Sequence, residues 1–424
     1  MDIKYELNSM KKETREHVDF LSMEEIQKAR DFHKSFKEYE PTPLVSLKNM
    51  AETFGVKGIY VKDETYRMGL NAFKVLGSSY AIGKYIAQKL NKDISELPYD
   101  KMVSDETKQE LGEITFATTT DGNHGRGLAW TAERLRQHSV VYMPKGTQEI
   151  RLKNIQKLGA EAEITDLNYD DAVRYTFAKA QENGWIVVQD TAWEGYTEIP
   201  TWIMQGYGTL ALEAFEQLQQ AGVAEPTHIF VQAGVGSFAG AVQGFFTNVC
   251  KDNPSTVVVE AGAADCLYKS AVAKDGNPHA VGGDLSTIMA GLACGEANTI
   301  GWDVLRDNST MFVSCPDWVA ANGMRILGNP LGNDTKVVSG ESGAVPTGLF
   351  VELMTNPQLE DMRKALKLDE NSQVLIFSTE GDTDPDMYRD IVWNGKYRHV
   401  NRKKTRTSNS VLPGFNSLPE LLRP

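Results

Sequence analysis

The sequence predicts an α/β protein with two open, twisted α/β domains and a functional site in the cleft between them. From residue 114 onward, short β-branched or apolar runs alternate with helical patterns of about 10 to 15 residues, which is typical of βαβ units and parallel sheets. The apolar runs alternate little, as expected of strands that helices cover on both faces. Because these units are too many for one sheet, we expect two domains with a site between them.

The predicted elements follow in order along the chain. A helix with a charged face is expected over residues 24–40, and "PTPL" at 41–44 enforces an extended segment after it. Asn71 is expected to cap a helix whose apolar residues recur as far as Leu90, and Thr147 to cap a helix that ends at Gly159. The predicted strands cover residues 114–120, 139–144, 185–190, 227–234, 255–262 and 372–379.

The composition indicates a soluble globular protein with large cores. The chain has 424 residues, 41% of them hydrophobic, and a formal net charge of −13. A nucleic acid is therefore not an expected partner. The one basic run, "RKKTR" at 402–406, lies in a polar tail that we interpret as a solvated extension.

The sequence shows no motif for secretion, membrane insertion, disulfide formation or metal binding, and these observations predict a cytoplasmic protein without a metal. The N-terminus has no apolar signal-peptide segment, and no apolar run approaches the roughly 20 residues that cross a bilayer, so no membrane association is expected. The four cysteines show neither CxxC nor paired spacing, which predicts reduced thiols in the cytoplasm. The seven histidines include no HExxH motif, so no metal site is expected.

Lys74, in the stretch "LNAFKVLG" at 70–77, is poorly suited to a structural role. Lysines usually lie on solvated faces, whereas Lys74 is set between Phe73 and Val75. It falls in the first turn of the predicted helix, where the helix dipole disfavours a cation. A structural lysine would fit better at the other end of the helix, so a functional role is indicated.

A first Gly-rich turn, "TTTDGNHGRG" at 118–127, follows a predicted strand. Its backbone N–H groups suit a carboxylate or a phosphate, and a helix is expected to begin near His124 or Gly125. Asp121, Asn123 and His124 would bring polar side chains into the same crevice. The alternative is a polar loop in which Asn and Gly are common for conformational reasons. Another turn, "SGESGAVPTG" at 339–348, either contacts a ligand or packs closely.

A second Gly-rich turn, "AGVGSFAGAVQG" at 233–244, predicts a phosphate site. Gly234, Gly236 and Ala239 have the G-x-G-x-x-A spacing of a dinucleotide fingerprint, and Glu260 ends the next strand where a ribose-binding acid belongs. Small residues and a helix N-terminus cradle any phosphate, however. An NAD-dependent oxidoreductase is therefore one hypothesis, although it assigns no role to Lys74.

Several motifs together resemble a known family. "NAFKVLG" resembles the Schiff-base lysine segment of the pyridoxal-phosphate enzymes related to the tryptophan synthase β subunit (fold type II), and "DGNHGRG" is similar to the Asn loop of their threonine and serine dehydratases. "AGVGSFAG" occupies the place of their phosphate loop, in the same order along the chain. The segments "KDETYRMGLNAFK", "VVQDTAWEGYTEIPTWIMQGY" and "STEGDTD" resemble the diaminopropionate ammonia-lyases more closely.

The resemblance implies roles for individual residues and pyridoxal 5′-phosphate as cofactor. Lys74 would form the Schiff base, and desolvation and the helix N-terminus would keep it neutral and nucleophilic. Asn123 would bond the cofactor's phenolate oxygen, and Ser378 or Thr379 would face the pyridine nitrogen. The phosphate would lie against Gly234, Val235, Gly236 and Ser237, and the substrate carboxylate against backbone groups of Thr119, Thr120 and Gly122.

Two carboxylates depart from the dehydratase pattern. Asp121 stands where the dehydratases have a small residue, and Asp190 ends the strand "WIVVQD". A substrate with a second ammonium group needs an anionic partner, and a carboxylate in a desolvated cleft can also act as acid or base. We therefore expect both acids to face the substrate, one for each enantiomer. The alternative for Asp190 is a capping or turn residue.

The resemblance predicts α,β-elimination of D- or L-2,3-diaminopropionate to pyruvate and two ammonia by way of aminoacrylate. The competing hypotheses are a serine or threonine dehydratase, which Asp121 argues against, the NAD-dependent enzyme, and a sensor that only binds an amino acid or the cofactor. The resemblance further implies a homodimer. We expect residues 1–78 and 191–400 to form the large cofactor-binding domain, 79–190 the small domain, and 401–424 an extension.

Overall fold

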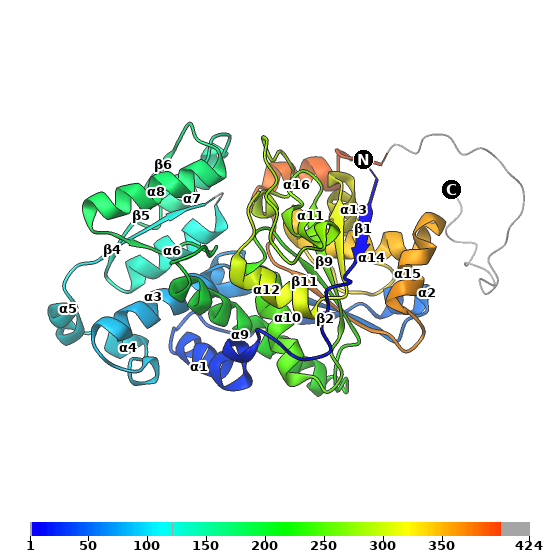
Figure 1. The fold of residues 1–424 in the computed structure, drawn as a ribbon, viewed down its shortest axis with the longest axis horizontal. Coiled ribbons are helices and arrows are strands. Elements are labelled where there is room, and N and C mark those ends of the chain that lie inside the picture. The colour runs from blue at the N-terminus through cyan, green and yellow to red at the C-terminus, as the bar shows by residue number, and fades with distance from the viewer. Residues whose placement is uncertain (1, 121, 400–424) are drawn as a thin grey trace, which may run out of the picture.

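The computed structural model describes residues 2–120 and 122–399, which form two sheets flanked by helices (Figure 1). Asp121 and the 401–424 extension lie outside the described residues. In spatial order, the strands of the larger sheet are β1 (Lys4–Leu7), β10 (Met311–Cys315), β9 (Ser255–Ala261), β8 (His228–Gln232), β11 (Gln373–Ser378), β3 (Gly58–Asp63) and β2 (Leu44–Ser46). Those of the smaller sheet are β6 (Glu161–Ile164), β5 (His138–Met143), β4 (Thr115–Thr119) and β7 (Ile186–Val187).

The helices fall into two sets by position along the chain. Those up to the end of the smaller sheet are α1 (Met23–Lys34), α2 (Lys48–Phe54), α3 (Val75–Lys89), α4 (Tyr99–Met102), α5 (Asp105–Leu111), α6 (Asn123–Arg134), α7 (Glu149–Gln156) and α8 (Tyr169–Asn183). The later helices are α9 (Glu198–Gln220), α10 (Ser237–Val249), α11 (Cys266–Ala273), α12 (Thr299–Asn308), α13 (Asp317–Gly328), α14 (Glu341–Thr355), α15 (Glu360–Leu366) and α16 (Pro385–Val392).

Both sheets have parallel centres, as the sequence predicts. All pairs in the smaller sheet are parallel, and in the larger sheet only the two edge strands, β1 and β2, pair antiparallel with their neighbours. The carboxyl ends of β8, β9 and β11 therefore meet at one edge of the larger sheet. Ligands of open α/β sheets bind outside this edge.

Helices cover the larger sheet on both faces, which explains its apolar strands. Successive residues of β8 face opposite sides: Ile229 and Val231 join a core with α3, α9 and α10, whereas Phe230 joins a second core with α13 and α14. The first core continues into the smaller sheet through Phe116 and Val141. Helix α3 contacts both α6 and α9, and so connects the two sheets.

Two predicted helix caps are wrong. Asn71 has a left-handed backbone, with φ of 56°, and α3 begins only after Lys74, which occupies the N-cap position. Thr147 donates its hydroxyl to the carbonyl of Pro144, and α7 runs only from Glu149 to Gln156. In both segments the chain makes a turn before the helix begins, and residue spacing alone does not reveal it.

The smaller sheet uses residues 115–187, and the larger sheet uses segments on both sides of this range. The chain thus leaves the larger sheet after β3 and returns to it at β8. The proposed domain limits at 78/79 and 190/191 stay a prediction. None of the described helices has both the length and the apolar composition needed to cross a membrane.

Candidate active site

A cavity of about 690 Å³ opens between the two sheets. Lys74, Thr119, Thr120 and Asp190 line it, all of them predicted site residues. A smaller cavity adjoins it, and its wall holds the other predicted site residues that reach the cleft: Asn123, Gly234, Val235, Gly236, Ser237 and Thr379. The fold therefore brings together side chains from segments that are far apart in the sequence.

Lys74 and Asp190 form an ion pair at the centre of the cleft. Lys74 Nζ lies 2.5 Å from Asp190 Oδ2, and the side chain of Asp190 is 5% exposed. The position of Lys74 at the N-cap of α3 adds a positive helix dipole beside its ammonium. Asp190 is thus a buried partner of the lysine, and the capping role considered for it does not apply.

The environment of Asp190 keeps it ionised. Burial alone raises the pKa of its carboxyl, but the charges of Lys74 and His124 outweigh burial and bring the pKa down to about 2. His124 Nδ1 lies 3.9 Å from the carboxylate, while its Nε2 bonds the carbonyl of Val188 at 2.7 Å. Because a carbonyl only accepts, Nε2 carries a proton and Nδ1 faces the acid.

The main chain of Asp190 is anchored to the Gly-rich turn before α10. Ser237 Oγ donates to the Asp190 carbonyl at 2.5 Å and accepts from Asn298 Nδ2 at 2.8 Å. The side chain of Ser237 therefore positions Asp190, which the sequence did not indicate. Its backbone N–H remains at the N-terminus of a 13-residue helix, where an anion is favoured.

Two glycines shape the same turn. A Cβ at Gly234 would lie 3.1 Å from the carbonyl oxygen of Gly291 and 3.2 Å from Leu292 Cα. Gly236 has φ of 100°, a conformation that L side chains rarely adopt. The turn therefore requires glycine at both positions, and its backbone can approach a phosphate closely.

At the end of β11, the two predicted hydroxyls, those of Ser378 and Thr379, have different surroundings. Thr379 lines the smaller cavity, and its Oγ1 accepts from Gln232 Nε2 at 2.7 Å, which leaves its own proton for donation. Ser378 is fully buried and lines neither cavity. Successive residues of a strand point to opposite faces, so only one of the two can face the cleft.

The helix after the Asn loop begins one residue before the predicted position, at Asn123. Asn123 Nδ2 donates to Glu380 Oε2 at 2.5 Å, and the amide is nearly buried. Glu380 was not among the predicted site residues. It lies next to Thr379 at the carboxyl end of a parallel strand, and this position could have identified it.

The backbone groups predicted to hold a carboxylate already have partners within the chain. The N–H of Thr119 donates to Gln189 Oε1 at 2.9 Å, that of Thr120 to the Tyr142 carbonyl at 3.2 Å, and that of Gly122 to Thr120 Oγ1 at 2.9 Å. These groups must exchange their partners before they can bind a carboxylate. Their role in substrate binding stays a prediction.

Glu260, the acid of the dinucleotide alternative, has a structural role. Its carboxylate accepts from the N–H groups of Leu267 at 2.8 Å and Tyr268 at 2.6 Å, and so satisfies the first turn of α11. The side chain is fully buried, and burial raises the pKa of its carboxyl well above the usual range. It has no surface left for a ribose, which removes the support for a nicotinamide dinucleotide.

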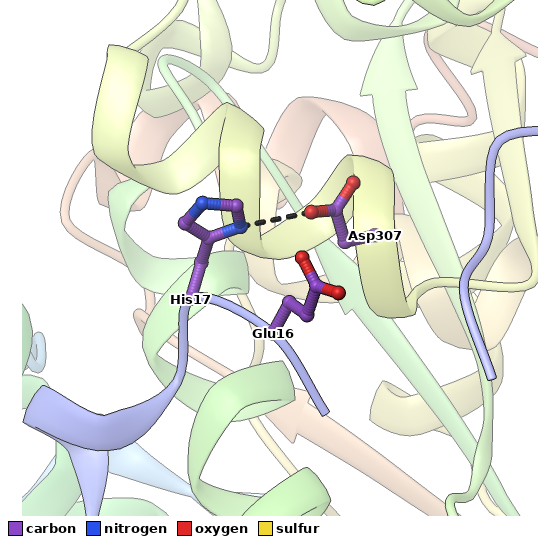
Figure 2. A group of neighbouring side chains, drawn as sticks. All are labelled: Glu16, His17 and Asp307. Carbon is purple, nitrogen blue, oxygen red and sulfur yellow. Dashed lines mark hydrogen bonds and ion pairs between the residues drawn. The ribbon is translucent and has the colours of Figure 1, made fainter. Parts of the chain in front are cut away.

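One group of metal-ligand side chains, Glu16, His17 and Asp307, lies outside the cleft (Figure 2). His17 Nδ1 is 2.8 Å from Asp307 Oδ2. The ammonium of Lys12 contacts Glu16 at 2.7 Å and Asp307 at 3.1 Å. Arg306 binds Asp307 as well. Side-chain cations therefore already balance these carboxylates, and the group ties the N-terminal segment to α12.

The comparisons with known proteins agree with this geometry. Residues 36–379 match the family model of pyridoxal-phosphate dependent enzymes. The diaminopropionate ammonia-lyase of Salmonella typhimurium is 52% identical over 93% of this chain and 98% of its own length, and that of Escherichia coli K12 is 53% identical over 89% and 93%.

Solved structures show the same relation. The E. coli diaminopropionate ammonia-lyase in complex with an aminoacrylate–PLP azomethine reaction intermediate has a TM-score of 0.86 at 49% identity, covering 94% of this chain and 98% of that chain. Its complex with D-serine has a TM-score of 0.88, covering 93% and 98%. A tomato threonine deaminase shares the fold alone, with 16% identity and a TM-score of 0.66 over 92% and 96%.

The fold and the site define a pyridoxal-phosphate-dependent enzyme of fold type II. Within that class, the chain belongs to the diaminopropionate ammonia-lyase family and is a carbon–nitrogen lyase.

The cleft itself fits the cofactor. Ser342 Oγ and Gln232 Oε1 are buried in the wall of the smaller cavity, and neither has a hydrogen-bond partner among the described residues. The glycine cradle, the lysine and the donor hydroxyl of Thr379 surround the same space. A ligand with a phosphate and several polar ring atoms would satisfy these groups.

Proposed function

We propose that this chain converts 2,3-diaminopropionate to pyruvate and two ammonia. The Cα proton and the distal amino group leave the substrate and yield aminoacrylate and the first ammonia. Water then hydrolyses aminoacrylate to pyruvate and the second ammonia. The observation that carries the residue assignment is the 2.5 Å contact between Lys74 Nζ and the buried carboxylate of Asp190.

Pyridoxal phosphate, when bound, supplies the carbonyl group for amines and the electron sink that makes the substrate Cα–H acidic. Lys74 would provide the amine that holds it, and Asn123 and Thr379 would orient its ring through the phenolate oxygen and the pyridine nitrogen. We assign the second role to Thr379 and not to Ser378 because only Thr379 lines the cavity. The backbone of Gly234, Val235, Gly236 and Ser237, which lines the smaller cavity, would hold the phosphate.

Asp190 moves a proton at its Oδ2 atom. While Lys74 is an ammonium, its charge is the strongest influence that lowers the pKa of Asp190, and the carboxylate is a weak base. Once Lys74 loses that charge, the strongest of the influences that lower the pKa of Asp190 is gone, and the pKa rises. Asp190 then becomes a base strong enough to accept the Cα proton and an acid able to protonate the leaving amine.

Asp121 is proposed as the second acid. A carboxylate in the Asn loop would bind the distal ammonium group, which a serine substrate lacks. With Asp190 on the other side of the substrate, each enantiomer would meet a proton acceptor. Thr119, Thr120 and Gly122 would bind the substrate carboxylate after exchanging their internal partners.

The test is pyruvate release from D- and L-2,3-diaminopropionate and from L-serine. We expect release from diaminopropionate in the wild type and none in Lys74→Ala. Asp121→Asn and Asp190→Asn should each impair one enantiomer more than the other. Full turnover of both enantiomers by both variants would remove the acids from the mechanism, and pyruvate mainly from serine would overturn the substrate.

A cytoplasmic homodimer is the proposed form of the enzyme. Cys250, Cys266 and Cys315 are buried and form no disulfide, which suits a reducing compartment. The exposed rings of Tyr66 and Trp393 are candidates for the dimer surface. Light scattering gives the molar mass directly, and a monomer at micromolar concentration would contradict the dimer.

A further inference from the structure

Glu380 is a buried carboxylate that the proposed reaction does not use. Its side chain lines the smaller cavity, and the residue is 4% exposed. Oε2 accepts from Asn123 Nδ2 at 2.5 Å, and Oε1 accepts from the N–H of Ser342 at 3.2 Å. The carboxylate thus joins α6, next to the smaller sheet, to the first turn of α14, which packs on the larger sheet.

The backbone around Glu380 is tied to the segment that carries Lys74. The N–H of Phe73 donates to the Thr379 carbonyl at 3.1 Å, and the N–H of Gly381 donates to the Asn71 carbonyl at 3.0 Å. The N–H of Gly340 donates to the carbonyl of Glu380 itself at 2.8 Å. The end of β11 is therefore held on both sides, so the carboxylate has a well-defined position.

We propose that Glu380 is a positioning residue that orients the amide of Asn123 toward the cofactor. Asn123 Nδ2 has two hydrogens, and the bond of the first to Oε2 leaves the second for the phenolate oxygen, which would accept it in the cavity that Asn123 lines. This inference rests on the role proposed for Asn123. It would make Thr379 and Glu380, which are consecutive residues, responsible for two polar atoms of the same ring: Thr379 for the pyridine nitrogen and Glu380, through Asn123, for the phenolate oxygen.

The charges around Glu380 are consistent with this role. Burial and the negative charge of Glu380 raise the pKa of Glu341 to about 7, with smaller effects from Arg151 and Asp384. The two acids therefore lie close enough to repel each other. Both oxygens of Glu380 accept hydrogen bonds, one from Asn123 Nδ2 and one from the N–H of Ser342.

Glu380→Gln tests the inference because it has almost the same shape. A carboxylate accepts on both oxygens, whereas an amide accepts on one and donates from the other end. The glutamine must therefore leave either Asn123 or Ser342 facing another donor. Glu341→Gln is the matched control, because it alters a neighbouring acid that makes no contact with Asn123.

The readouts are the dissociation constant of pyridoxal phosphate and the pH titration of its visible absorption in the bound state. We expect Glu380→Gln to weaken cofactor binding about tenfold and to displace the titration midpoint in the same direction as Asn123→Ala. In the Asn123→Ala background, Glu380→Gln should have no further effect, because the group it acts through is gone. The control, Glu341→Gln, should change the dissociation constant by the same factor in the wild type and in Asn123→Ala.

Each outcome has one meaning. If Glu380→Gln weakens pyridoxal-phosphate binding equally in the wild type and in Asn123→Ala, the role of Glu380 is merely structural and the inference is overturned. A normal midpoint and affinity in Asn123→Ala would refute the proposed role of Asn123, independently of Glu380. If Glu380→Gln does not fold, Glu380→Asp retains the charge but is one methylene too short to reach both donors, and the same coupling is expected.

Discussion

Asp190→Asn should shift the pH at which Lys74 becomes reactive. The pKa of Asp190 is about 2 against an ordinary value of 3.8, although burial alone raises it. This difference corresponds to about 2 kcal/mol, so the charges of Lys74 and His124 and the hydrogen bonds to Asp190 together contribute at least that much, with Lys74 the largest contributor. Because such coupling is reciprocal, removing the carboxylate should lower the pH at which Lys74 becomes neutral by about one unit.

The assay is the rate at which the apoenzyme captures pyridoxal phosphate, followed by visible absorption across a pH series. The rate rises with the neutral fraction of Lys74, so the midpoint for Asp190→Asn should lie about one pH unit below that of the wild type. Asp265→Asn is the control, since Asp265 is buried and bonds Ser314 but lines neither cavity. An unchanged midpoint, or one displaced to higher pH, would refute the reasoning.

Three further substitutions test other parts of the structure. Glu341 has its pKa raised from 4.5 to about 7 in the folded state, so its contribution to stability is full below pH 4.5 and lost as the pH rises to about 7. Glu341→Gln should therefore gain up to about 3 kcal/mol over the wild type between those pH values in thermal unfolding, and a constant difference would contradict this. Gly236→Ala should cost about 1 to 3 kcal/mol in denaturant unfolding of the apoenzyme and weaken cofactor binding, because φ is 100° there. If Gly236→Ala leaves the affinity for pyridoxal phosphate unaltered, the turn does not bind the phosphate. Glu213→Gln should cost about 3 to 5 kcal/mol in urea unfolding, because Glu213 is the buried partner of both Arg67 and Lys62, and a loss under 1 kcal/mol would show that the network relaxes.

The central strands could be predicted from the sequence, but the edges of the larger sheet could not. Strands β8, β9 and β11 are continuous apolar runs, because helices bury both of their faces. Strands β1 and β2 have four and three residues, each of them partly or fully exposed, and no pattern that short distinguishes a strand from a loop. Strands β3 and β10, which are not edge strands, were also missed, although five of the six residues of β3 and all five of β10 are buried.

Residues were easier to predict as members of the site than as partners of one another. Lys74 was identified from its unusual local setting and Asp190 from its place at the end of a predicted strand, but their contact depends on how the two sheets pack. Asn123 was expected to bind the cofactor, but its bond to Glu380 was not expected. Glu380 is 257 residues away in the sequence, so no local pattern links the two. Ser237 was expected to lie against the phosphate, which stays a prediction, and the bond of its side chain to the main chain of Asp190 is one that only the structure can show.

The bond from Ser237 to Asp190 determines where the chain must bend if the cleft opens. Val188 follows the last strand of the smaller sheet and is held there by the bonds of its carbonyl to His124 and of its N–H to Ala117. Asp190, two residues later, is held by α10 of the larger sheet. Because the side chain of Gln189 also bonds the main chain of Thr119, relative motion of the two sheets would bend the chain between Gln189 and Asp190, and Asp190 would move with the Gly-rich turn before α10. Opening would then separate His124 from Asp190 but leave Asp190 attached to the Gly-rich turn before α10.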